Sequence, residues 1–225
     1  MTYSPKVGQS LAQTLVNLHK ITYNRKMFEI ELKAHIYDRD ALVQKIKTFA
    51  TFSQKLLKND TYYHLPKENA TGEKDVCVRL RTEVEITDTH TKQKHIFTYK
   101  RKEKKVSDNG IETEFNDEKE CELSSFDALE SFFQDAEFTP YLTKQKSVED
   151  YIVNTPCGKA TLELCEVARL GDFLEIEILS ESNDEKTVSR IQAELKNLLA
   201  KCGIPETDIE NRYYSELLAE SNNGN

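Results

Sequence analysis

Charged and apolar residues alternate in five short runs of this chain, and each run places charges of one dominant sign on one face. In the run from Phe28 to Lys33, the residues Glu29, Glu31 and Lys33 occupy every second position, and apolar residues fill the positions between. Strict alternation is the pattern of a β-strand with one apolar face. The pattern returns in four later runs, whose charged pairs are Arg79 and Arg81, Glu120 and Glu122, Lys144 and Lys146, and Glu175 and Glu177.

Two architectures accommodate such strands, and they differ in where the charges point. In an open antiparallel sheet, the charged faces contact water and the apolar faces cover a core. In a closed barrel, the charged faces converge on the interior, where the charges need partners or bound ions. Periodicity alone favours the open sheet, because a half-solvated sheet is the usual setting for alternating strands.

Helical spacing of apolar residues predicts helices between and around these strands. One is expected over residues 38–58, one after the serine pair 124–125, either of which can cap it, and one over residues 184–203. Shorter helices are expected before Phe28 and through Tyr214. The apolar stripes are Leu11, Leu15 and Leu18; Leu42, Ile46, Phe49 and Phe52; Leu129, Phe132 and Phe133; Val188, Ile191, Leu195 and Leu198; and Leu217 and Leu218.

Turn signals separate the predicted strands, and the order of elements gives an α+β fold. Asp108-Asn109-Gly110 is a hairpin signal between two alternating runs, and Thr71-Gly72 is a weaker turn signal upstream. Further turns are expected at residues 155–158 and near Gly171.

Composition narrows the function classes. The 225 residues include 38% hydrophobic ones and no linker-like tract, which predicts one domain with one substantial core. The net charge of -8 argues against general nucleic-acid binding, although local basic pairs suit a small polyanion. The five cysteines form no CxxC pair and the five histidines show no ligand spacing, so neither zinc nor disulfides are expected. The N-terminus shows no apolar targeting or spanning segment, so a cytoplasmic protein without membrane contact is expected.

Seven segments together resemble the CYTH superfamily, the triphosphate tunnel metalloenzymes. FEIELK resembles the family's ExExK signature, and six later segments follow in the family's order. They are DTYYHLP, VRLR, FTYK, TKQK, LGDFLEIE and YYSELL. The resemblance implies a closed eight-stranded antiparallel β-barrel with helices packed outside, and it reverses the preference for an open sheet. The family domain is expected at residues 27–220, before a disordered tail at 221–225. The resemblance does not cover residues 1–26, an extension that the leucine spacing predicts to be helical.

The resemblance also implies roles for the charged strand residues. Carboxylates would hold Mg²⁺ or Mn²⁺, since hard oxygen ligands suit these ions. The metal ligands implied are Glu29, Glu31, Glu175 and Glu177. The groups implied to bind phosphates are Lys33, Arg79, Arg81, Lys100, Lys144 and Lys146. Catalytic roles fall on Lys33, Glu120 and Glu122, although the register leaves open which of Glu114, Glu118, Glu120 and Glu122 line the tunnel.

Two positions depart from the family pattern. Cys165 stands where many members have an aspartate, about ten residues before Glu175, and Lys146 stands where an arginine is usual. A missing carboxylate would weaken a second metal site. Asp60 and Tyr62, in the DTYYHLP segment, are equally well explained as residues that shape a turn and a strand.

The resemblance is strongest to the class IV adenylate cyclase branch, which converts ATP to cyclic AMP and pyrophosphate. The segments that favour this branch are DTYYHLP, LGDFLEIE and YYSELL. The alternative is a triphosphatase that hydrolyses tripolyphosphate, thiamine triphosphate or nucleoside triphosphates. A third hypothesis, which Cys165 keeps open, is a catalytically inactive nucleotide or polyphosphate binder. The expected partner is ATP or another triphosphate, and the sequence leaves both a monomer and a homodimer open.

Overall fold

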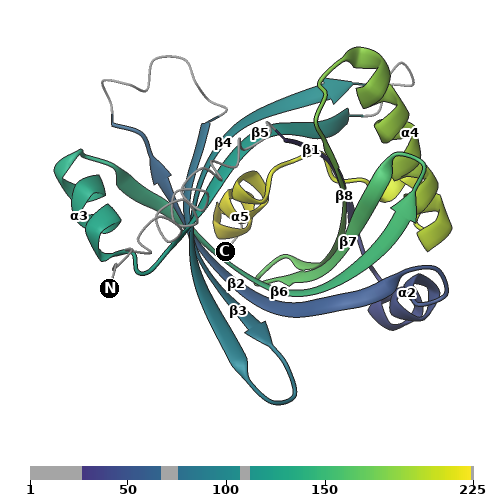
Figure 1. Ribbon diagram of the computed structural model, residues 1–225, viewed down its shortest axis with the longest axis horizontal. Helices are drawn as coiled ribbons and strands as arrows, with labels where there is room; N and C mark the ends of the chain where they lie inside the picture. Colours follow the sequence, from purple (N-terminus) through teal and green to yellow (C-terminus); the bar gives the residue numbers. More distant parts are fainter. Residues whose placement is uncertain (1–26, 67–75, 107–111, 224–225) are drawn as a thin grey trace, which may run out of the picture.

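Eight antiparallel strands close into a barrel in the computed structural model (Figure 1). The structure describes residues 27–66, 76–106 and 112–223. The helix expected before Phe28 and the turns expected at Thr71-Gly72 and Asp108-Asn109-Gly110 lie outside the described residues.

Runs of antiparallel strands are separated by helices, in agreement with the predicted α+β fold. In chain order they are β1 (Phe28–His35), α2 (Arg39–Ile46), β2 (Thr51–His64), β3 (Val76–Ile86), β4 (Thr91–Val106), β5 (Glu112–Leu123), α3 (Asp127–Asp135), β6 (Thr139–Thr155), β7 (Gly158–Val167), β8 (Gly171–Ser180), α4 (Glu185–Cys202), the 3₁₀ helix η2 (Glu206–Asp208) and α5 (Tyr214–Asn223).

The barrel closes through β1, which lies between two strands that are distant in sequence. The strand order is β1-β5-β4-β3-β2-β6-β7-β8, and β8 pairs with β1. In this register Glu31 lies opposite Glu114 of β5 and opposite Glu177 of β8. The predicted closed barrel is confirmed, and the open sheet is excluded.

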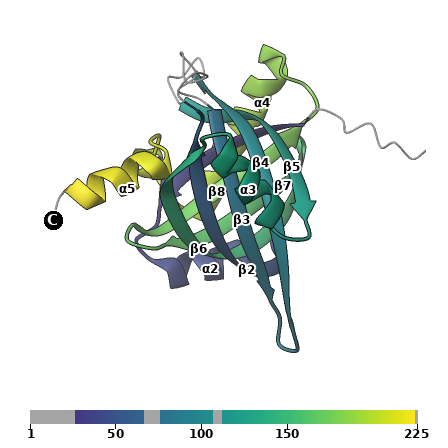
Figure 2. The same cartoon turned by 90° about the vertical axis from the view of Figure 1, so that its left-hand side faces the viewer.

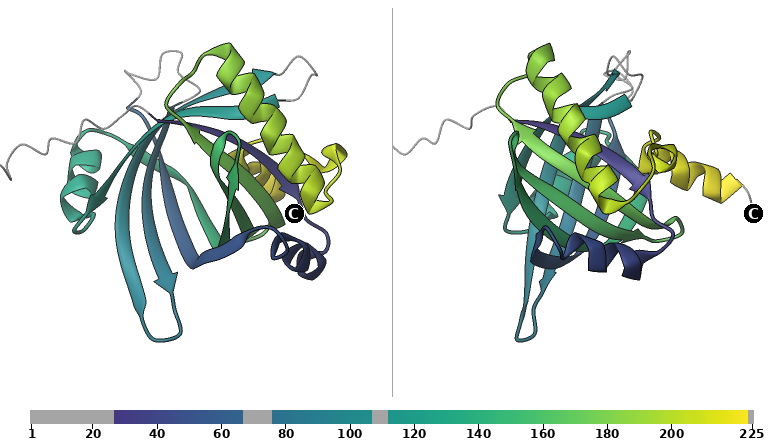
Figure 3. Two further views of the ribbon diagram at one scale, coloured as in Figure 1. Left: turned by 45° about the vertical axis from the view of Figure 1, so that its right-hand side comes forward. Right: turned by 90° about the vertical axis from the view of Figure 1, so that its right-hand side faces the viewer.

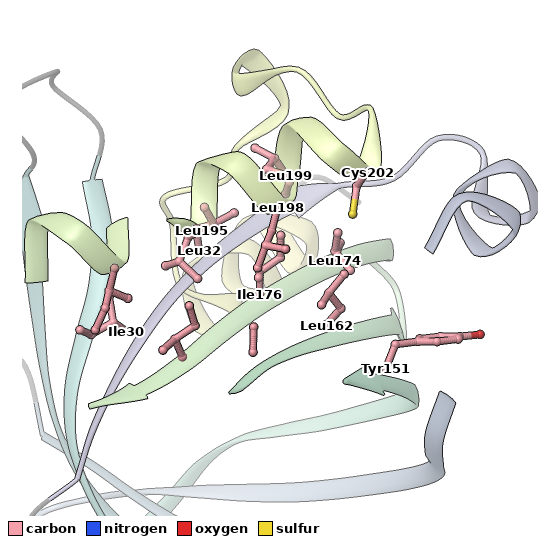
Figure 4. Packing of buried hydrophobic residues seen from close by; sticks show 14 of the residues in the cluster. Ile30, Leu32, Tyr151, Leu162, Leu174, Ile176, Leu195, Leu198, Leu199 and Cys202 are labelled. Atoms are coloured by element: carbon pink, nitrogen blue, oxygen red, sulfur yellow. The ribbon is translucent and has the colours of Figure 1, made fainter. Parts of the chain in front are cut away.

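The outer apolar faces of β1 and β8 form the main core together with α4 (Figure 4). Side chains such as Ile30 and Ile176, which alternate with the charged residues, are fully buried there. Figure 3 shows α4 lying across this outer surface. The side chain of Asp184 caps the helix by accepting a hydrogen bond from the backbone N–H of Thr187, and Gly203 ends it at φ 79°. A left-handed residue at that place favours glycine, so the predicted helix at 184–203 is confirmed.

A second core lies between α3 and the outer face of β3 and β4. Phe133 of α3 packs there against Val78 and Leu80. The predicted serine cap is wrong, because the residue before the helix is Phe126 and its side chain makes no capping hydrogen bond. The aromatic contacts of Phe133 instead hold the helix on the sheet.

The helix predicted over residues 38–58 is correct only for its first half. The helix begins after Asp38, whose side chain accepts a hydrogen bond from the backbone N–H of Ala41, and ends at Ile46. The rest of the segment belongs to β2, which pairs with β3 on one side and β6 on the other. Backbone pairing on both edges outweighs local spacing, and from Leu56 onward alternate side chains are buried.

The C-terminal helix α5 lies at one mouth of the barrel. In Figure 1, which looks into the barrel, α5 is seen within the ring of strands, and in Figure 2 it projects from one end. Leu217 packs against Val148, Val167 and Phe173. The helix continues to Asn223, into the segment that the sequence predicts as a tail. In the described part of the chain, no helix is long and apolar enough to cross a membrane.

Leu174→Ala should destabilise the fold far more than Leu179→Ala on the same strand. Leu174 is fully buried under α4, whereas Leu179 is 48% exposed. The first change should lower the free energy of unfolding by about 2 to 5 kcal/mol and the second by less than about 1 kcal/mol. Denaturant unfolding measures both, and equal losses would contradict the packing of α4 on β8.

Candidate functional site

A cavity of about 150 Å³ runs inside the barrel, and most of the side chains that line it carry a charge. All eight strands contribute to the lining, as do Tyr213, Tyr214 and Ser215 at the start of α5. The carboxylates are Glu29, Glu31, Glu114, Glu118, Glu163, Glu175 and Glu177. The cations are Lys33, Lys58, Arg79, Arg81, Lys100, Lys102, Lys144 and Lys146.

The strand order sorts these charges into two walls. Strands β7, β8, β1 and β5 are neighbours, and they carry all seven lining carboxylates, which we call the acidic wall. Strands β4, β3, β2 and β6 form the other half and carry the basic wall, which comprises all the lining cations except Lys33 of β1. A cation set that faces a carboxylate set across a small cavity can bind a polyanion together with a metal ion.

The structure brings together most of the residues singled out from the sequence. The four predicted metal ligands and the six predicted phosphate-binding residues all line the cavity. Of the four glutamates whose register was open, Glu114 and Glu118 line it. Glu120 lies nearby and accepts hydrogen bonds from Arg79 and Thr98. Glu122 is exposed and does not line the cavity, so the structure does not support its catalytic assignment.

Sequence reasoning missed Lys58, Lys102 and Glu163. Lys58 was missed because the sequence predicts its segment as the end of a helix. In β2 it lies on the same face as Asp60 and Tyr62. Lys102 continues the alternation of Lys100 along β4, and Glu163 shares the parity of Cys165 on β7. That parity is the signal that identifies all three.

Asp60 organises the basic wall. Its carboxylate accepts two hydrogen bonds from Arg81, at 2.7 and 3.1 Å, and one from the Tyr62 hydroxyl at 3.1 Å. The ammonium of Lys144 lies 3.3 Å away. Burial acts to raise the pKa of Asp60, but Arg81 and Lys144 hold it well below its usual range. Asp60 therefore holds the side chains of Arg81 and Lys144 in place and remains ionised although it is buried.

One part of the acidic wall has too few cations. Glu29, Glu31 and Glu177 lie near one another, and Lys100, which bonds Glu29 at 2.7 Å and Glu118 at 2.8 Å, is the main cation beside them. Burial and then repulsion from neighbouring glutamates raise the pKa of Glu31 to about 7 and that of Glu177 to about 8. This group of carboxylates can be stabilised either by protons or by a cation.

Asn116 gives a second sign of a ligand at this place. It lies opposite Glu29 in the pairing of β5 with β1 and is fully buried. Neither amide atom has a hydrogen-bond partner within the described part of the chain. A buried amide without partners is costly unless something binds it. The atoms that could bind a metal ion here are hard oxygen atoms, so the residues present fit Mg²⁺ or Mn²⁺.

A second group, Glu163, Cys165 and Glu175, also has metal-ligand character, since its ligand atoms lie within 4.8 Å of one another. Its charges are already neutralised. Lys146 contacts Glu163 and lies 2.7 Å from Glu175, and Lys58 also pairs with Glu163. Burial raises the pKa of the Cys165 thiol to about 12, so it stays protonated. We therefore favour the carboxylates around Glu31 as the metal site.

The pattern that defines the CYTH domain matches residues 27–214 of this sequence. The chain belongs to the CYTH family. Comparison with curated proteins found no match.

Solved structures share the fold of this CYTH protein. The PH1819 protein from Pyrococcus horikoshii OT3 is 26% identical, with a TM-score of 0.65 over 85% of this chain and 98% of the other. A protein from Vibrio parahaemolyticus, described as a candidate adenylate cyclase, is 18% identical, with the same TM-score and coverage. HpAC1 from Hippeastrum, an adenylyl cyclase candidate with a dominant triphosphatase activity, is 17% identical, with a TM-score of 0.52 over 82% and 90% of the two chains.

The stability of this CYTH protein without divalent cations should fall as the pH rises from about 5.5 to about 8.5. Glu31 and Glu177 have raised pKa values in the fold, so the folded state binds more protons than the unfolded state between the ordinary glutamate pKa and about 8. The free energy of unfolding therefore decreases as these protons are lost. Denaturant unfolding with chelator at the two pH values measures this.

Glu177→Gln provides the control, because it removes one of the two titrating groups. The variant should lose stability less steeply with pH than the wild type, and saturating Mg²⁺ should also reduce the slope. A wild-type stability that is independent of pH and of Mg²⁺ over this range would contradict the undercompensated acidic wall.

Proposed function

We propose that this CYTH protein is a divalent-metal-dependent enzyme that acts on a triphosphate, with the conversion of ATP to cyclic AMP and pyrophosphate as the leading reaction. The observation that carries the proposal is the pairing of a basic wall with an undercompensated acidic wall across one cavity. A triphosphate chain alone would suit the basic wall, and a divalent cation alone would suit the carboxylates. A metal-bound triphosphate suits both at once.

The residues divide between the two tasks. Arg79 and Arg81 offer planar forks to phosphate oxygens, and the lysines of both walls add point charges. Glu29, Glu31 and Glu177 would hold Mg²⁺ or Mn²⁺, with Asn116 beside them. When bound, such a cation neutralises charge that builds up on phosphate oxygens.

Three residues predicted from the sequence take more specific parts in this proposal. Glu175, an implied metal ligand, is paired with Lys146 and would position that ammonium. Lys33 contacts Glu114 at 3.6 Å and extends the set of cations to β1. Glu120 bonds Arg79 at 3.0 Å and would orient its guanidinium.

A less charged end of the cavity favours a nucleoside triphosphate. Tyr62, Cys77, Tyr141 and Leu142 line that end, and Tyr62 lies opposite Leu142 in β6 and opposite Arg79 in β3. The rings of Tyr62 and Tyr141 are 6.3 Å apart. Aromatic and apolar side chains next to a phosphate-binding arginine suit a base and ribose attached to the phosphates. The 3′-hydroxyl of such a ribose could then attack the α-phosphorus.

Hydrolysis of the terminal phosphate is the second candidate, and the charge of the cavity favours it. Outside the end near Tyr141, most of the lining side chains are charged, which suits an inorganic tripolyphosphate with a water molecule as nucleophile. Both reactions use the same cations and the same metal ligands, so the products must be measured.

Incubation of the purified protein with Mg²⁺ or Mn²⁺ should convert ATP mainly to cyclic AMP and pyrophosphate, faster at mildly alkaline pH. The 3′-hydroxyl attacks only when it loses its proton, which alkaline pH favours, and no histidine lines the cavity within the described part of the chain. Alkaline pH also keeps Glu31 and Glu177 ionised. Chromatography of cyclic AMP, pyrophosphate and orthophosphate, from ATP and from tripolyphosphate, measures the reaction.

Glu31→Gln is the matched variant, because it keeps the side-chain shape and removes the charge. It should lower the rate by on the order of 10² to 10³ while the protein stays folded. If orthophosphate is released from tripolyphosphate faster than cyclic AMP forms from ATP, the protein is a triphosphatase rather than a cyclase. Tight binding without any product would favour the inactive binder, and full activity in excess chelator would refute the metal-dependent proposal.

A further inference from the structure

The ring of Tyr214, at the start of α5, lies among three of the cavity's ammonium groups. Lys33 of β1 lies 4.7 Å from the ring centroid, Lys144 of β6 lies 4.8 Å from it, and Lys146 of β6 lies 5.5 Å from it. All three distances are within the range of an attractive cation–π interaction. Tyr214 itself lines the cavity, so this interaction takes place inside the proposed phosphate site.

Phe173 and Cys165 contact the Tyr214 side chain, and the carboxylate of Glu175 also interacts with its hydroxyl. Phe173 of β8 meets the ring edge to face, with centroids 5.2 Å apart and planes at 89°. The Tyr214 hydroxyl lies 3.5 Å from the Cys165 sulfur, and either group can donate the hydrogen bond. Cys165, the residue that replaces the aspartate of the family pattern, therefore anchors a tyrosine.

The three lysines need such support because carboxylates compete for them. Lys146 is paired with Glu163 and Glu175, Lys144 is 3.3 Å from Asp60, and Lys33 is 3.6 Å from Glu114. Long lysine side chains have many rotamers, and the ring adds a fixed neighbour that limits them while the carboxylates hold the other side of each ammonium. An aromatic face attracts an ammonium but leaves its other sides free for phosphate oxygens.

We propose that Tyr214 is a positioning residue that holds Lys33, Lys144 and Lys146 in the arrangement that binds a triphosphate. The inference rests on the proposed triphosphate-binding function and adds a part for α5 that the strand residues do not supply. The backbone fixes the same arrangement, because the Lys33 ammonium also donates a 2.6 Å hydrogen bond to the carbonyl of Arg212, two residues before Tyr214.

Calorimetric titration of the full chain with tripolyphosphate in Mg²⁺ tests this proposal in three steps. The wild type should bind. Tyr214→Leu, which removes the ring, should weaken tripolyphosphate binding by on the order of tenfold and should weaken orthophosphate binding less, because orthophosphate contacts fewer ammonium groups. Tyr214→Phe, which keeps the ring and loses only the hydroxyl, should bind tripolyphosphate within about twofold of the wild type.

Leu199→Ala, in the core between α4 and the outside of the barrel, is the control for a general loss of stability. It should lower the melting temperature without changing the affinity for tripolyphosphate. If the wild type does not bind tripolyphosphate, the proposed function fails and the inference with it. If the wild type binds and Tyr214→Leu binds as tightly, or if Tyr214→Phe is as weak as Tyr214→Leu, the positioning role alone is refuted.

Discussion

The structure depends on the compensation of charges that the barrel removes from water. A closed barrel whose strands alternate apolar and charged residues places one of the two faces inside, and here helices α3 and α4 cover the apolar face outside. The charged face is then buried, which is costly unless each charge has a partner. Arg79, Arg81 and Lys144 all face the carboxylate of Asp60, and Arg79 also pairs with Glu118 and Glu120. The carboxylates around Glu31 do not have enough cations, and this imbalance gives the cavity its chemistry.

Cys165 and Lys146, the two departures from the family pattern, both lie at the carboxylate group of Glu163 and Glu175, and they make it different from the group around Glu31. Cys165 cannot contribute a negative charge at neutral pH, and Lys146 supplies a positive charge to Glu163 and Glu175. One end of the acidic wall is thus neutral without a metal ion. The other end keeps Glu29, Glu31 and Glu177 with raised pKa values, so the requirement for a cation is concentrated there.

Parity along the strands was enough to predict which faces are charged, and the order of the CYTH segments was enough to predict closure. The sequence could not predict the register, that is, which residues of neighbouring strands lie opposite each other. Glu114, Glu118, Glu120 and Glu122 all lie on the same face of β5. The register that places Glu114 opposite Glu31 decides that Glu114 and Glu118 line the cavity. Lys58 was not predicted as a site residue, because its segment has the spacing of a helix but pairs with β3 and β6 as strand β2. Tyr214 was recognised as part of a helix and of the YYSELL segment but not as a site residue, since its contacts come from strands distant in sequence.

The most direct test of the undercompensated acidic wall is anomalous diffraction from crystals grown with Mn²⁺ and an ATP analogue that resists cleavage. We expect a manganese peak at coordination distance from the carboxylates of Glu29, Glu31 and Glu177, with the triphosphate lying along Arg79, Arg81 and Lys144. A manganese peak bound instead by Glu163, Cys165 and Glu175, with Lys146 displaced, would contradict the account.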